Sequence, residues 1–493
     1  FISFDNVNRP DAGIYHLPYV KILNDFKIII GSANFNPLFG ATSIFQYISA
    51  IFNNYIFKDI GVTIPHALLS IYFIDYFLRN FFSNSDKDLF YKLFIFTLAS
   101  YFLIEMNRYS DYGNDTPGHL FSFYLLSLFV KKDFNLENKE NFKLFALISL
   151  FCFLNRPFLI LFIFLAIYIW IKKKHFLSFS AFPIFSLFFL FFWMAKNILV
   201  SGCAIYPIKF TCFDNLSWYS NEAKFRIAAR NSSEFSELHA KGWEDIIKNR
   251  EYINYEHKTE EKQNYLKNFN WLNKDYISKH SHTFKKKIDF FILYLIIVSS
   301  CLYFLKDNKK DFNSTIKDER YKILIILSSI GLFLMIYKFP LGRYGTSYLA
   351  IFIYCIFFPI ISFFSNKSSI KKNGKILGIF LIILSTLFFG KNINRIVKNY
   401  SADYNQSPWP RIYDNYFKIS GSNKLQNLPI EFKKINKNRI LDIYYINEEN
   451  FYSSERKILC LYNKAPCTQT SENFKTFDVE IYKGYYFVKL NKV

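Results

Sequence analysis

The sequence predicts an all-α polytopic membrane bundle of about ten transmembrane helices, with an exported insertion and a small exported C-terminal domain that is α/β or otherwise contains strands. Composition is the first observation, because 51% of the 493 residues are hydrophobic and 21% are aromatic. The second is the recurrence of apolar stretches of about 15–22 residues with few charges, the length that crosses about 30 Å of hydrocarbon. The third is an alternation of lysine-rich and lysine-poor loops, which is typical of membrane proteins.

The apolar stretches set the expected domain boundaries. The first 40 residues are expected to form a loop, and residues 1–60 together form an exported segment with an interfacial helix at Ala41–Phe57. The remaining domains are expected to be an N-terminal transmembrane bundle at 61–200, an exported insertion at 201–287, a C-terminal bundle at 288–390 and an exported domain with strands at 391–493. The expected spans are about Gly61–Phe82, Leu89–Met106, His119–Val130, Phe142–Leu154, Phe158–Ile171, Phe176–Val200, Ile288–Leu305, Tyr321–Tyr337, Tyr348–Phe364 and Lys375–Phe389. Because the chain opens at Phe1 within a polar segment, we expect a further transmembrane helix before it.

The net charge of +22 is better explained by membrane topology than by nucleic-acid binding. Lysines gather in alternate short loops, as the positive-inside rule requires. This alternation predicts that the opening loop, the central insertion and the C-terminal tail share the non-cytoplasmic side. The expected location is therefore the bacterial inner (cytoplasmic) membrane, crossed many times, with the active face periplasmic and membrane lipids as partners.

Four cysteines form two local pairs in segments that are expected to be exported. Cys203 lies near Cys212 in the insertion, and Cys460 lies near Cys467 in the tail. Two disulfides in an oxidising compartment are the expected arrangement. A zinc site built from all four is the alternative, although neither pair has the C-x-x-C spacing that such sites favour.

The segment Asp11–Pro18 holds an acid, a phenol and an imidazole just before the first expected span. If the segment is helical, Asp11 and Tyr15 share a face. A partly desolvated carboxylate near a membrane surface is a candidate general base. Alternatively, Asp11 is a solvated acid that caps a helix beginning near Ala12.

A second polar cluster, Asn107–His119, is predicted on the same side of the membrane. It contains Arg108, Asp111, Asp115 and His119, more ionisable groups than a connection needs, although Asp115 could simply cap the next helix. Arginine suits bidentate phosphate binding. The other candidate substrate-binding residues are Tyr15, His16, Arg156, Lys196, Arg343 and Tyr344.

The sequence contains no nucleotide-binding G-x-x-x-x-G-K-[ST] loop, no H-E-x-x-H and no G-x-S-x-G. A nucleotide-dependent enzyme, a zinc protease and a serine hydrolase are therefore not expected. With nucleotides confined to the opposite side, a donor molecule should be carried by lipid.

Several short motifs resemble those of the GT-C superfamily of polytopic glycosyltransferases, which includes protein O-mannosyltransferases and lipid A aminoarabinose transferases. Asp11 with Tyr15-His16-Leu17-Pro18 resembles the first exported loop of bacterial members. Lys196-Asn197, followed by Ser201-Gly202 and Tyr206-Pro207, resembles an "RN…SG…(Y/F)P" stretch with lysine in place of arginine. The segment from Pro340 to Tyr344 resembles a late exported loop. Ala465-Pro-Cys-Thr468 resembles a segment of uncharacterised bacterial membrane proteins.

The resemblance implies transfer of a sugar from a polyprenyl-phosphate carrier to a lipid or glycan acceptor. It implies that Asp11 is the base, with inversion at the sugar carbon, and that Asp111 or Asp115 is the second acid. Arg343, Arg108 and Arg156 would hold the carrier phosphate as it leaves. The first span of the family is missing and no Glu adjoins Asp11. No cofactor is indicated, and dependence on a divalent metal is left open.

Two other functions are consistent with the same features. A polysaccharide polymerase or ligase would also use polyprenyl-linked glycans, with exported Arg and His in place of an Asp base. A lipid or solute transporter would gather its polar residues at the midplane of the bilayer. The place where the polar residues converge discriminates between an enzyme and a transporter.

Overall fold

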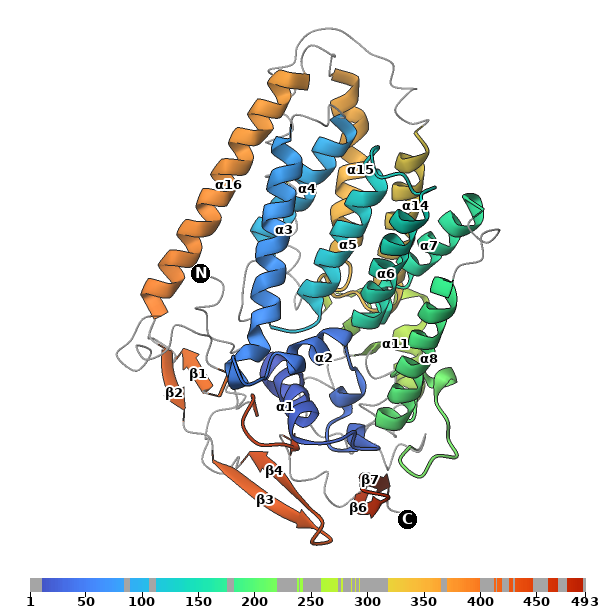
Figure 1. Ribbon diagram of the computed structural model, residues 1–493, viewed down its shortest axis with the longest axis vertical. Coiled ribbons are helices and arrows are strands. Elements are labelled where there is room, and N and C mark those ends of the chain that lie inside the picture. The colour runs from blue at the N-terminus through green and yellow to red at the C-terminus, as the bar shows by residue number, and fades with distance from the viewer. Residues whose placement is uncertain are drawn as a thin grey trace.

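The computed structural model is dominated by long helices that lie side by side, with the short helices α1 and α2 and all the strands gathered at one end (Figure 1). It describes residues 11–83, 89–105, 112–174, 181–219, 237–238, 240–242, 259–273, 276–277, 285, 289, 292, 318–364, 370–399, 412–413, 415–418, 425–428, 431–446, 460–468 and 477–490.

The α-helices follow the apolar stretches of the sequence. They are α1 (Leu17–Asp25), α2 (Ile44–Ile51), α3 (Ile64–Phe82), α4 (Leu89–Glu105), α5 (Asp115–Val130), α6 (Lys139–Asn155), α7 (Leu161–Lys172), α8 (Ala181–Ser201), α11 (Thr259–Leu266), α14 (Glu319–Lys338), α15 (Thr346–Phe364) and α16 (Ile370–Asn399). A π-helical turn, Ala12–His16, precedes α1. Short 3₁₀ turns occupy Ser32–Asn34, Pro37–Gly40, Lys58–Thr63, Pro157–Leu159, Lys209–Thr211 and Lys267–Phe269.

Helix α5 lies at the centre of the main hydrophobic core. Its apolar residues are buried on every side, the pattern of a helix enclosed by other helices. Side chains of α3, α4, α6, α7, α14, α15 and α16 join it in one cluster rich in Phe and Leu. By contrast, α3, α14 and α16 each leave a stripe of large apolar side chains exposed, such as Leu68, Ile71 and Tyr72 on α3.

The predicted bundle of about ten transmembrane helices, resembling the GT-C fold, is wrong. Three described helical segments are long and apolar enough to cross a membrane: Lys58–Phe82, Glu319–Lys338 and Leu377–Asn394. In the other apolar helices the described apolar segments are shorter, such as Phe90–Ile104 and Thr346–Pro359. The three segments agree with membrane association, but the prediction of a many-span inner-membrane protein is corrected. The span expected at Ile288–Leu305 lies almost wholly outside the described residues.

The opening segment is not the loop that the sequence predicts. It forms the π-helical turn, α1 and two 3₁₀ turns before α2 begins. Gln46, a polar residue within the expected interfacial helix, lies buried in α2. Its side chain accepts a hydrogen bond from the backbone of Ser43 in a capping box, which fixes the start of the helix.

The tail contains strands, as predicted, and its described residues form three small sheets. The strands are β1 (Asn415–Lys418), β2 (Leu425–Leu428), β3 (Phe432–Lys437), β4 (Leu441–Ile446), β5 (Cys467–Thr468), β6 (Phe477–Tyr482) and β7 (Tyr485–Leu490). Adjacent strands in sequence pair antiparallel within β1-β2, β3-β4 and β6-β7, and β5 pairs parallel to β4. Ile30 exchanges backbone hydrogen bonds with Tyr486 and Val488 at 2.9 and 2.8 Å. The two ends of the chain therefore form one packed unit.

Candidate functional site

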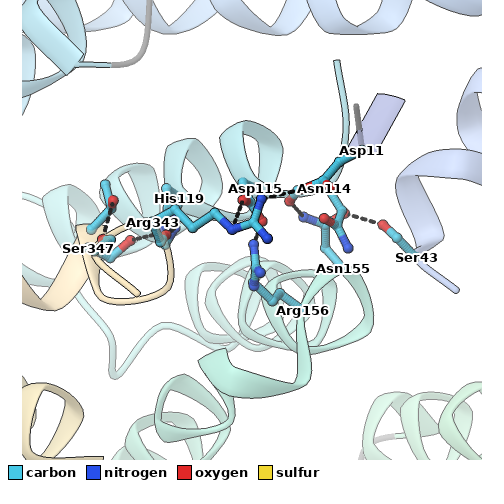
Figure 2. Close-up of polar contacts among 11 residues, drawn as sticks. Asp11, Ser43, Asn114, Asp115, His119, Asn155, Arg156, Arg343 and Ser347 are labelled. Atoms are coloured by element: carbon cyan, nitrogen blue, oxygen red, sulfur yellow. Dashed lines mark hydrogen bonds and ion pairs between the residues drawn. The ribbon is translucent and has the colours of Figure 1, made fainter. Parts of the chain in front are cut away.

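Two aspartates and two arginines meet where helices begin and end (Figure 2). We call Asp11, Asp115, Arg156 and Arg343 the quartet. Asp11 precedes the π-helical turn, Asp115 is the first residue of α5, Arg156 follows α6 and Arg343 precedes α15. Arg343 forms an ion pair with Asp11, and its Nε lies 3.9 Å from Asp115 Oδ2. Arg156 forms an ion pair with Asp115, so the four charges form one chain.

The Asp11 carboxylate does not cap the helix that follows it. No side-chain cap hydrogen bond is formed there, and the carboxylate instead accepts from the Arg343 guanidinium. Burial alone raises the pKa of the Asp11 carboxyl, but the neighbouring cations, Arg343 above all, outweigh burial and hold the pKa below its usual value. Asp11 is therefore an ionised carboxylate at neutral pH. It becomes a stronger base if Arg343 turns away.

Pro18 explains why the segment after Asp11 forms a π-helical turn. In the turn, the N–H of Leu17 donates to the carbonyl of Ala12. The next N–H along the chain would belong to Pro18, which has none. The carbonyls of Gly13 and Ile14 are instead satisfied from distant segments: Leu461 N donates to Gly13 O at 2.9 Å, and Asn36 Nδ2 donates to Ile14 O at 3.3 Å. π-Helical turns of this kind are frequent at functional sites.

The two arginines have different surroundings. The Arg156 side chain is 12% exposed, and its guanidinium carbon lies 4.1 Å from the centroid of the Tyr344 ring, a cation–π distance. The Arg343 side chain is 49% exposed. Burial lowers the pKa of Arg156. Burial also acts to lower the pKa of Arg343, but the adjacent Tyr344 and Asp11 raise it overall.

His119 holds the loop that carries Arg343. Its Nε2 lies 2.7 Å from the backbone carbonyl of Arg343 and its Nδ1 lies 2.7 Å from Ser347 Oγ. Because a carbonyl only accepts, Nε2 carries the proton and, in the neutral ring, Nδ1 accepts from the serine hydroxyl. The buried ring thus has both nitrogens engaged, so His119 positions the loop that carries Arg343, and its role as a substrate ligand stays a prediction.

A buried network of neutral side chains fixes the backbone around the quartet. Ser43 Oγ donates to Asn155 Oδ1 at 2.5 Å, and Asn155 Nδ2 donates to the carbonyl of Asn114 at 2.6 Å (Figure 2). These bonds join the start of α2, the end of α6 and the start of α5. Asp115 and Arg156 directly follow Asn114 and Asn155 in the chain, so the network sets their positions.

Residues 2–350 match the family model of a domain of unknown function, DUF8201. The chain belongs to this family. No curated protein and no solved structure matches the chain. The DUF8201 region contains the whole quartet, Tyr344 and His119, whereas the strands of the tail lie beyond it.

Two further predicted residues of the DUF8201 region, Tyr15 and His16, lie near the quartet. The ring of His16 is buried, and its Nδ1 lies 3.2 Å from Gln46 Nε2. Burial lowers the pKa of His16 to about 3, so the ring is neutral at physiological pH. A Cβ at Gly113 would lie 2.8 Å from His16 Nε2, so only glycine lets the 112–114 backbone approach the ring. Burial also raises the pKa of the Tyr15 phenol.

Lys196 belongs to a separate cluster. Its ammonium group donates to Thr42 and Asn197 and lies 3.5 Å from the centroid of the Trp193 ring. The same ammonium group lies 5.0 Å from the centroid of the Tyr47 ring. This lysine therefore stabilises the contact between α8 and the segment before α2.

The predicted residues Asp111 and Arg108 lie outside the described residues. The cysteines form the two predicted pairs, with S–S bonds of 2.04 Å for Cys203–Cys212 and 2.01 Å for Cys460–Cys467. Within the described part of the chain, no three His, Cys, Asp or Glu side chains gather in a way that could hold a metal ion.

Sequence reasoning missed the neutral residues that support the site. Ser43 and Gln46 have the S-x-x-Q spacing of a capping box, a signal that could have placed the start of α2. No local sequence pattern indicates that Asn155 or Ser347 supports the site, because their hydrogen-bond partners are distant in the sequence.

Proposed function

We propose that this protein is a membrane-associated glycosyltransferase that moves a sugar from a polyprenyl-phosphate carrier to a lipid or glycan acceptor on the exported face of the membrane. The observation that carries the proposal is the convergence of Asp11 with Arg343 and Arg156, which come from three distant parts of the chain. A carboxylate that can accept a proton and two cations that can receive a phosphate are what such a transfer requires. Two of these residues, Asp11 and Arg343, belong to motifs of the sequence that resemble those of GT-C enzymes.

In the resting site, Arg343 neutralises Asp11. A donor phosphate that binds Arg343 would draw the guanidinium from Asp11, whose pKa would then rise toward that of a better base. The acceptor hydroxyl gives its proton to the Asp11 carboxylate as its oxygen attacks the anomeric carbon. The bond from that carbon to the phosphate oxygen breaks on the opposite face, which inverts the configuration.

The departing carrier phosphate gains negative charge during this step. Arg343, the more exposed of the two arginines, is the one that can turn toward it, and Arg156 supplies a fixed positive charge beside it. Asp115 contacts both arginines. In this mechanism it holds them in place before the donor binds.

The positions of the charges favour an enzyme over a transporter. Asp115 opens α5, Arg156 follows the last residue of α6, and Arg343 lies between α14 and α15. The charges thus lie at helix ends, whereas a transport path would need them near the middle of the spans.

The decisive experiment compares Asp11→Asn with Asp25→Asn in the full-length protein in membranes. Asp25 pairs with Lys21 on α1 at 3.2 Å and serves as a matched control for loss of a carboxylate. Transfer from radiolabelled polyprenyl-phosphate sugars is measured alongside binding of the carrier. We expect Asp11→Asn to abolish transfer while binding persists, with Asp25→Asn unchanged. Equal transfer by the two variants, or no transfer by the unaltered protein from any polyprenyl-phosphate donor, would refute the proposal.

A further inference from the structure

The tail supplies a backbone donor to the segment that carries Asp11. In the π-helical register the Gly13 carbonyl would pair with the nitrogen of Pro18, which carries no hydrogen, so it needs a donor from elsewhere in the chain. Leu461 N provides it at 2.9 Å. Leu461 lies far beyond the DUF8201 region, so a segment outside that region completes the π-helical turn.

Leu461 adopts an uncommon backbone conformation to make this bond. Its φ is +50°, in the left-handed region that residues other than glycine enter infrequently. Such conformations persist where surrounding contacts hold them. Here the Leu461 side chain is fully buried in a cluster with Ala12, Leu17 and Val20.

Tyr462 makes a second connection to the same region. Its hydroxyl oxygen accepts from Asn24 Nδ2 at 2.6 Å and from Asn53 Nδ2 at 2.8 Å. Its backbone N donates to Ile412 O at 2.9 Å. One buried phenol therefore joins the end of α1 to the turn after α2.

A disulfide closes the loop that carries both residues. Cys460 bonds to Cys467, and Cys467 begins β5, which pairs with β4. Tyr444 N also donates to Pro466 O at 3.0 Å. Closure of a short loop reduces the conformations open to it, so Leu461 N is held where the Gly13 carbonyl needs it.

We propose that the Cys460–Cys467 loop is a positioning element that holds the π-helical turn and thereby aims the Asp11 carboxylate. We call this holding of the turn by the loop the clamp. The clamp is a claim about structure, and only its consequence for catalysis rests on the proposed function. Arg343 and Arg156 are held by other parts of the chain, through His119, Tyr344 and Asp115. Opening the loop should therefore displace Asp11 while the phosphate-binding arginines stay in place.

The test opens each disulfide in turn in the full-length protein. The variant Cys460→Ser/Cys467→Ser is compared with Cys203→Ser/Cys212→Ser, and amide hydrogen exchange is followed by mass spectrometry in peptides from 12–25 and from α5. We expect exchange in 12–25 to quicken about tenfold in the first variant, the size expected for loss of one or two hydrogen bonds, with α5 unchanged. The second variant should leave 12–25 unchanged.

Tyr462→Phe keeps the disulfide and removes only the hydroxyl. This variant therefore tests whether the loop holds the turn if the double serine variant fails to fold. Quicker exchange at 12–25 in either variant supports the clamp, and unchanged exchange in both overturns it. Where transfer activity is measured, kcat should fall between about tenfold and a hundredfold with KM for the donor unchanged. Faster exchange in a protein without transferase activity would leave the clamp standing and refute the proposed function instead.

Discussion

Arg156 and Arg343 contact the same aspartate and the same tyrosine ring, yet they occupy different environments. Arg156 is 12% exposed and lies against the face of Tyr344, whereas Arg343 is 49% exposed and is shared between Asp11 and Asp115. Burying a charge is costly unless its partners stay in place. Arg156 is therefore a fixed part of the structure, and Arg343 is the arginine that can exchange its partner for a ligand.

The largest expected difference between the two arginines is in activity. Arg343→Ala should lower kcat by about 10² to 10³, the loss typical when one donor to a developing negative charge is removed. Because Arg343 is half exposed, its removal should change thermal stability little. Transfer assays and unfolding curves in detergent measure the two effects. A large loss of stability with normal transfer would show that Arg343 is structural.

Arg156 should show the opposite behaviour. Arg156→Met leaves Asp115 without its nearer cation and should cost about 3 kcal/mol of unfolding free energy, within the range for breaking a buried pair. Arg156→Lys is the matched control, since it keeps the charge but loses the planar stacking on Tyr344. Chemical denaturation in detergent gives the values. Equal stability of Arg156→Met and the unaltered protein would remove the distinction between the two arginines.

The effect that is smallest at neutral pH concerns His16, whose pKa is lowered from 6.5 to about 3 by burial, with Asp11 opposing the shift and both arginines supporting it. Below pH 6.5 the His16 ring is protonated in the unfolded state, whereas in the folded state it takes up a proton only near pH 3. Stability from this site is therefore full above pH 6.5 and falls as the pH drops toward 3. His16→Gln should flatten that part of the curve of unfolding free energy against pH. An unchanged slope would mean that His16 is protonated in the folded protein.

The sequence identified all four members of the quartet, because acids and arginines next to apolar runs are visible in the residues themselves. It could not show that Arg343 contacts Asp11, which is 332 residues away. It could not show the partners of His119 either, because a histidine held by a carbonyl and a serine looks the same in sequence as one that binds a ligand. It also missed the π-helical turn, whose outside donors, Leu461 and Asn36, come from other segments.

The number of membrane spans was mispredicted for a different reason. Helix α5 is apolar on all sides because other helices enclose it, and an apolar stretch looks the same in sequence whether protein or lipid surrounds it. The exposed stripes on α3, α14 and α16 do coincide with the three candidate spans.

The contacts between the two ends of the chain have a consequence for synthesis on the ribosome. The carbonyl of Gly13 can form its hydrogen bond only after Leu461 has been made, and Ile30 can pair only after Tyr486 and Val488 have been made. At about 5–20 residues per second, the ribosome needs roughly 20 to 100 s to make the intervening chain. During that time the newborn Asp11 segment lacks its final partners. A segment that is translated long before its partners is thus among the last to reach its finished form.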